Sequence, residues 1–150
     1  MNFEQPAQIP ADFVSDAERK IEKGLVLDLP ITEEELNERC EGDTNCETAL
    51  EALLEYSTRY AADVWNMKQL LTQRSEYSDE EWKELFARAD DDRTRLHNTL
   101  IDSIGILSRA LTKAGEDNQW VKELAPNGKL ERARCGKFAI MLCYSKYVNS

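Results

Sequence analysis

The sequence lacks the residue patterns that usually mark a catalytic site. It contains a single histidine, His97, and this excludes metal centres that need several imidazole ligands. It has no GxSxG motif, no paired cysteine and histidine signature, and no glycine-rich loop of the kind that binds phosphate. We therefore expect a protein that works by binding rather than by nucleophilic catalysis, and we expect no cofactor.

Glycine, proline and long apolar runs are also scarce. Six glycines and four prolines in 150 residues, with abundant Leu, Ala, Glu and Lys, favour helices over strands. The longest apolar run, residues 138–144, is far shorter than the roughly 20 residues that span a bilayer, and the N-terminus has no signal-peptide pattern. We predict one all-α domain over residues 1–150, a compact helical bundle that is cytoplasmic and binds no membrane.

The sequence has 29 acidic and 19 basic residues, which gives a net charge of −10. This charge argues against direct binding to nucleic acid. Nine carboxylates fall within residues 32–55, where Arg39 is the one basic residue. This block is either a solvated face that keeps the protein soluble or a surface that docks on a basic partner protein. The residues we expect on such a surface are Glu33, Glu34, Glu38, Glu47, Glu51 and Glu55.

The docking hypothesis is the one we favour from the sequence. A concrete form of it is a counter-defence inhibitor of a phage or mobile element, of anti-CRISPR or nucleic-acid-mimic type, which blocks a basic nucleic-acid groove. Amphipathic helices of this kind also allow a homodimer, and the sequence leaves the oligomeric state open.

Helix start signals divide the chain. Residues 1–30 are predicted to be a partly extended arm with a short helix that ends at Gly24. Thr32 with Glu35 forms a capping box that begins a short acidic helix, and a long core helix is expected over about residues 46–73. Its apolar face is predicted to include Leu50, Leu53, Leu54, Ala61, Val64, Met67 and Leu71.

A second capping box, Ser78 with Glu81, begins another long helix. It either runs unbroken through residues 90–92 or stops there, since three aspartates also suit a new helix N-terminus. Gly115 is expected to close it, residues 126–128 to form a turn, and a last helix to cover about residues 130–148. The bundle thus has two long core helices, a C-terminal helix and short N-terminal helices.

Residues 90–111 join the strongest apolar stripe to the polar residues of greatest interest. Leu96, Leu100, Ile104, Leu107 and Leu111 fall on one helical face, and Arg93 and His97 lie at its start. One interpretation is structural: Arg93 pairs with an aspartate such as Asp90, His97 hydrogen-bonds a helix end, and Arg134, expected mid-stripe on the last helix, is capped by carbonyls. The other is a pocket for a small anionic ligand such as a nucleotide, formed by Arg93, His97, Asn98, Arg109, Arg132 and Arg134.

The four cysteines occur without a CxxC spacing. Cys135 and Cys143 are about 12 Å apart along one predicted helix and cannot bridge each other. We expect reduced, mostly buried thiols; a disulfide between Cys40 and Cys46, or an unexpected metal, stays open.

A faint resemblance links residues 80–102 to the all-α nucleotide pyrophosphohydrolases. Those enzymes hold magnesium through a Glu-x-x-Glu and a Glu-x-x-Asp element, which correspond here to Glu81 and Glu84, with Glu80 beside them, and to Thr99-Leu100-Ile101-Asp102. The second element lacks its glutamate, which leaves few oxygen ligands for magnesium on this helix, so a magnesium-dependent nucleotide pyrophosphohydrolase is the third hypothesis, after docking and small-anion binding.

A second resemblance covers about residues 56–144. The segment resembles a small uncharacterised helical family of bacteria and phages, a domain of unknown function. The family pattern matches Asp90, Arg93, His97, Asn98, Leu100 and Ile101, then Arg109, then Arg132, Gly136, Phe138 and Ala139. Ser108 stands where the family has Asn, and Lys137 where it has an acid. The resemblance implies a shared helical fold and no particular activity.

Overall fold

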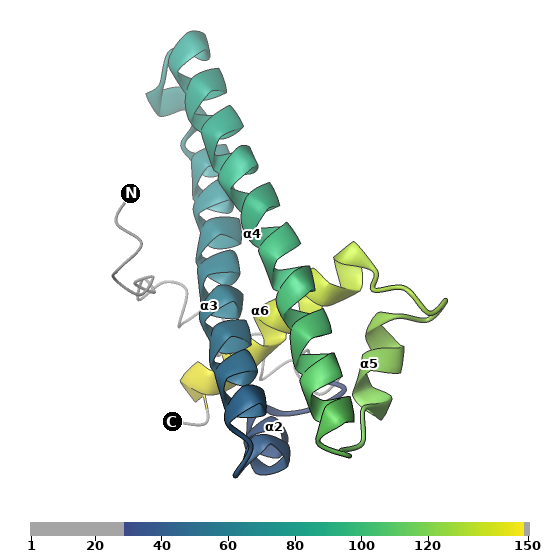
Figure 1. Ribbon diagram of the computed structural model, residues 1–150. Coiled ribbons are helices and arrows are strands. Elements are labelled where there is room, and N and C mark those ends of the chain that lie inside the picture. Colours follow the sequence, from purple (N-terminus) through teal and green to yellow (C-terminus); the bar gives the residue numbers. More distant parts are fainter. Residues whose placement is uncertain (1–28, 149–150) are drawn as a thin grey trace.

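Two long antiparallel helices form the frame of the molecule (Figure 1). The computed structural model describes residues 29–148, and the helix predicted before Gly24 lies outside them. This part of the chain contains no strand. Its elements are α2 (Glu33–Cys40), α3 (Thr44–Thr72), the short 3-10 helix η1 (Arg74–Glu76), α4 (Asp79–Lys113), α5 (Gln119–Leu124) and α6 (Arg132–Val148). The prediction of an all-α bundle with two long core helices and a C-terminal helix is therefore confirmed.

Helices α2, α3 and α4 begin where a short polar side chain accepts a hydrogen bond from a free backbone N–H group. Thr32 and Glu35 form the predicted reciprocal capping box of α2. At the start of α3 the Asp43 side chain accepts a hydrogen bond from the backbone N–H of Cys46. At the start of α4 the Ser78 hydroxyl accepts one from the backbone N–H of Glu81. Gly115 follows the C-cap of α4 with a φ of +79°, a conformation that side chains with a β-carbon rarely adopt.

Helix α4 runs unbroken through its three aspartates, which decides between the two alternatives that the sequence left open. Asp90 lies one turn before Arg93 and pairs with it at 2.8 Å, so this carboxylate is satisfied within the helix. The continuous α4 has 35 residues, about 52 Å at 1.5 Å per residue.

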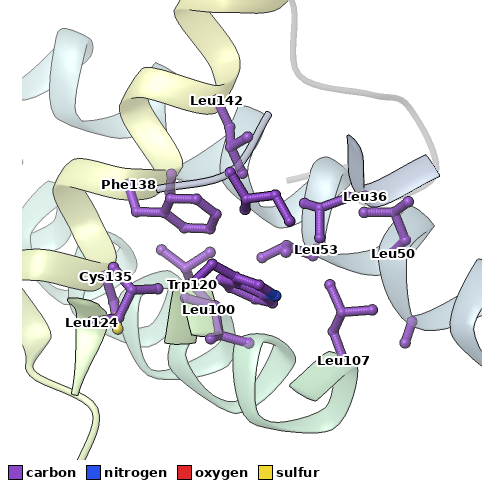
Figure 2. Close-up of a cluster of buried hydrophobic side chains, with 14 of the residues drawn as sticks. Leu36, Leu50, Leu53, Leu100, Leu107, Trp120, Leu124, Cys135, Phe138 and Leu142 are labelled. Carbon is purple, nitrogen blue, oxygen red and sulfur yellow. The ribbon is translucent and has the colours of Figure 1, made fainter. Parts of the chain in front are cut away.

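The core lies at one end of this frame, where α2, α5 and α6 cover the α3–α4 pair. Leu53, Leu100, Leu107, Phe138 and Leu142 converge there (Figure 2). Trp120 of α5 stacks on Phe138 at a centroid distance of 5.7 Å, which closes that side of the core.

All four cysteines are free and buried. Burial, with smaller contributions from neighbouring acids and from the Cys46 thiol, raises the pKa of Cys40 to about 11. No helix in the described part of the chain is long and apolar enough to cross a membrane.

Among the helices of residues 29–148, none besides α3 and α4 themselves covers the far half of the α3–α4 hairpin (Figure 1). None of residues 63–96 is buried. The prediction that Leu71 shares the buried face of α3 is wrong, because its side chain is 56% exposed. Leu71 continues the apolar stripe of Leu50 and Leu53 along α3. Within residues 29–148, however, α2, α5 and α6 pack on the α3–α4 hairpin only near the core.

Candidate functional site

A polar cluster forms where α3, α4 and α6 meet. The His97 ring lies 4.9 Å from the Tyr60 ring, centroid to centroid, and its Nε2 is 2.7 Å from the backbone oxygen of Arg132. A carbonyl oxygen only accepts, so Nε2 carries the proton of the neutral ring. His97 is only 6% exposed, and its Nδ1 has no hydrogen-bond partner among the described residues. The ring therefore ties α4 to the first turn of α6.

The charge state of His97 follows from its surroundings. Burial lowers the pKa of the imidazole, and the positive charges of Arg132 and Arg93 act in the same direction. The hydrogen bond to the Arg132 carbonyl opposes this shift. A ring with a lowered pKa is neutral at pH 7, which suits a packing role better than the binding of an anion.

The neighbouring arginines are engaged within the chain. Arg93 Nη2 lies 2.8 Å from Asp90 Oδ1, and its side chain is 28% exposed. The hydrogen bond to Asp90 raises the pKa of Arg93, and Tyr60 adds to the rise. Arg132 Nη1 donates to Asn98 Oδ1. Four of the predicted ligand-binding residues thus come together as a set of contacts between the helices.

The other two predicted ligand-binding residues lie elsewhere. Arg109 is exposed and lies twelve residues beyond His97 on α4, about 18 Å along the helix. The prediction that Arg134 lies in the apolar stripe of α6 is wrong, because its side chain is 51% exposed. Its Nη1 donates to the backbone oxygen of Glu123 at 2.9 Å, and its Nε lies 3.3 Å from Glu131 Oε2. Arg134 therefore links α6 to α5.

Sequence reasoning missed Asp63 and the role of Tyr60. Asp63 Oδ2 is buried without a hydrogen-bond partner among the described residues. Burial, and then the charge of Asp92, raises the pKa of Asp63 to about 6. A signal was present in the sequence, because Ser57, Tyr60 and Asp63 repeat every three residues on the inner side of a predicted core helix.

The predicted acidic surface lies at the core end of the molecule, on α2 and the first half of α3. Helix α2 buries Leu36 and Cys40 and points its acids outward. On α3 the acids follow a spacing of four residues, which places them away from the buried Leu50 and Leu53. We call this the acidic face; it consists of Glu33, Glu34, Glu38, Glu47, Glu51 and Glu55.

Two features of the acidic face bear on binding. Glu51 and Glu55 border a shallow hollow on the outer side of α3, together with Thr48, Ala52 and Thr58. Glu55 pairs with Arg59 at 2.8 Å, whereas Glu47 and Glu51 have no ion pair within residues 29–148.

The carboxylates that resemble the pyrophosphohydrolase elements do not meet within one chain. Glu80 and Asp102 lie on the same continuous helix, 22 residues or about 33 Å apart, and both are exposed. Across residues 29–148 no group of three or more His, Cys, Asp or Glu side chains could hold a metal ion.

Comparison with known proteins supports the family resemblance. No curated protein and no solved structure matches the chain. A family model described as protein of unknown function (DUF3232) matches residues 8–134, which is most of the sequence and contains the whole polar cluster. The chain therefore belongs to the family of proteins of unknown function DUF3232.

Proposed function

We propose that this protein is a non-catalytic helical binding protein, and that its acidic face docks on a basic surface of a partner protein. The observation that carries this proposal is the row of Glu47, Glu51 and Glu55 on α3. Like charges four residues apart on a helix each cost a few tenths of a kcal/mol, so the row weakens the helix that bears it. A basic partner would neutralise the row and recover that cost.

The acidic face has a rigid base. Leu36 and Cys40 on the inner side of α2, and Leu53 on the inner side of α3, are essentially inaccessible to solvent. The carboxylates are therefore presented without a large loss of backbone freedom on binding. The net charge of −10 adds long-range attraction toward a basic partner.

A groove that binds nucleic acid is one basic surface of this kind. A counter-defence inhibitor that occupies such a groove is the most specific form of the proposal. In that form, nucleic acid and this protein would compete for the same partner. By contrast, Arg93, His97 and Arg132 each donate one hydrogen bond within the chain, and these bonds are directed at protein oxygens, so the small-anion alternative gains no support from their geometry.

The proposal can be tested by capture of partners from a lysate of the native host. The tagged full chain is the bait, and a triple variant with Glu47→Lys, Glu51→Lys and Glu55→Lys is compared with it. A matched control carries Glu80→Lys, Asp91→Lys and Asp102→Lys, which changes the net charge equally at exposed sites on α4.

We expect the α3 triple variant to lose a basic partner that the bait and the control both capture, with unchanged helical circular dichroism. Equal capture by all three proteins would overturn the proposal. Equal loss in both variants would also overturn it, because net charge rather than the acidic face would then govern capture.

A further inference from the structure

Two cysteines meet across the turn that joins α2 to α3. Cys40 is the last residue of α2, and Cys46 lies in the first turn of α3. Their side chains are 1% and 0% exposed and belong to the same hydrophobic core. The Cys40 thiol donates a hydrogen bond to the Cys46 sulfur. Two sulfur atoms that are six positions apart in the sequence are therefore neighbours inside the protein.

The turn between them holds the backbone of both cysteines. The backbone N–H of Asp43 donates to the backbone oxygen of Cys40 at 3.0 Å, and the Asp43 carboxylate accepts from the backbone N–H of Cys46 at 3.0 Å. Gly42 has a φ of +85°, which allows the chain to reverse within so few residues. Because one aspartate anchors both backbones, the two thiols stay close without any rearrangement of the helices.

This arrangement favours a disulfide in the folded chain. A disulfide forms only between cysteines whose β-carbons already lie close together, and groups that the fold holds in place react as if at very high concentration. The bond is uncharged and apolar, so it can replace two thiols in a core without burying a charge.

The surroundings of the thiols set the rate of the reaction. Burial, and then the neighbouring Cys46 and acidic side chains, raise the pKa of Cys40 to about 11, while burial and Asp43 raise the pKa of Cys46. Only the thiolate attacks a disulfide, so the bond forms slowly at pH 7. A thiol of high pKa is also a poor leaving group, so the bond is slow to be reduced once it has formed.

We propose that Cys40 and Cys46 form an internal disulfide under oxidising conditions, and that this bond fixes α2 to α3. The thiolate of one cysteine attacks a small disulfide such as oxidised glutathione and releases one reduced molecule. The thiolate of the other cysteine then attacks the mixed disulfide and releases the second. The two protein thiols are oxidised, the small disulfide is reduced to two thiols, and the two protein protons pass to the released thiolates.

The bond would join the inner sides of the two helices whose outer sides form the acidic face. It is detected by mass rather than by partner capture. A failure of this proposal is therefore distinguishable from a failure of the docking role.

The test is refolding of the reduced, unfolded full chain in a buffer of reduced and oxidised glutathione, where burial does not prevent access to the thiols. Free thiols are then alkylated in denaturant, counted by intact mass and located by peptide mapping. We expect two of the four cysteines to be protected, as one bond between Cys40 and Cys46. The chain carries its own matched control, because Cys135 and Cys143 are also buried but lie about 12 Å apart along α6, so both should be alkylated.

The oxidised chain should also unfold at a temperature about 5–10 °C higher than the same sample after reduction, since the bond constrains the unfolded chain. Alkylation of all four cysteines would overturn the proposal, as would a bond that includes Cys135 or Cys143. A glutathione adduct on Cys40 or Cys46 that does not close to the internal bond would equally overturn it. An unchanged unfolding temperature would contradict the claim that the bond fixes α2 to α3.

Discussion

A β-carbon on Gly136 would lie 2.8 Å from the Tyr60 hydroxyl oxygen and 3.3 Å from His97 Nε2. The first distance is shorter than real β-carbon contacts, so α6 can approach α3 and α4 this closely only with glycine at this position. His97 and Arg132 lie close to Gly136, because His97 Nε2 donates to the backbone oxygen of Arg132 at the start of α6 and Arg132 donates to Asn98 of α4. These contacts hold α6 against α3 and α4.

Replacing Gly136 with alanine should therefore destabilise the fold by about 1–3 kcal/mol, the usual range for overpacking in a core. Tyr60 cannot move aside easily, because its ring is buried. Chemical denaturation followed by circular dichroism measures the change. In a Tyr60→Phe background the same substitution should cost less, since the closest oxygen is absent. An equal cost in both backgrounds would remove the Tyr60 hydroxyl from the explanation.

Asp63→Asn should stabilise the protein at neutral pH. The pKa of Asp63 is raised to about 6, so the folded chain binds more protons than the unfolded chain between about pH 4 and 6, and ionisation weakens the fold as the pH rises. Solvent screening of this half-buried group reduces the gain to about 1 kcal/mol above pH 6. Thermal unfolding at pH 7.5 and pH 4 measures the gain, which should vanish at the lower pH. A gain in stability of the same size at both pH values would contradict a raised pKa for Asp63.

His97 should have the opposite pH dependence. Its pKa is lowered in the folded chain, so the unfolded chain binds more protons just below its ordinary value of 6.5, and the free energy of unfolding falls as the pH drops. The comparison is best made in an Asp63→Asn background, where the opposing carboxyl is absent. There, His97→Gln should flatten the pH profile between about pH 6.5 and 5. An unchanged slope in that variant would argue against a neutral, buried His97.

The two ends of the hairpin should respond differently to loss of a leucine side chain. Leu107 is fully buried, and Leu107→Ala should cost about 2–5 kcal/mol. Leu71→Ala should change the stability of the monomeric chain by less than about 0.5 kcal/mol, because its side chain is largely exposed. Denaturant titration at low protein concentration compares them. Similar losses at both sites would mean that the core extends into residues 63–96, the half of the α3–α4 hairpin that lies away from α2, α5 and α6.

Local sequence signals predicted the helices well, because each depends on residues within one or two turns. The Thr32 and Glu35 capping box and the stripe that contains Leu100 and Leu107 are of this kind. Continuity of α4 at its aspartates could not be decided in this way, since Asp90 serves equally well as an N-cap or as the partner of Arg93.

The errors arose where the outcome depends on distant parts of the chain. Leu71 continues a correctly predicted apolar stripe, but the sequence does not indicate that no third helix of the described residues covers it. Arg134 lies on a helix with apolar residues on most sides, so its buried face is set by where α5 packs. The contact of Gly136 with Tyr60 joins residues that are 76 positions apart, although a lone glycine inside a predicted helix was a usable signal of close approach.

The docking role of the acidic face is tested most directly by calorimetric titration of a purified captured partner into the full chain. The α3 variant with Glu47→Lys, Glu51→Lys and Glu55→Lys should bind about 100-fold more weakly, and the affinity of the full chain should fall as salt is added. The α4 control variant should bind like the full chain. Unchanged affinity in the α3 variant would contradict the account.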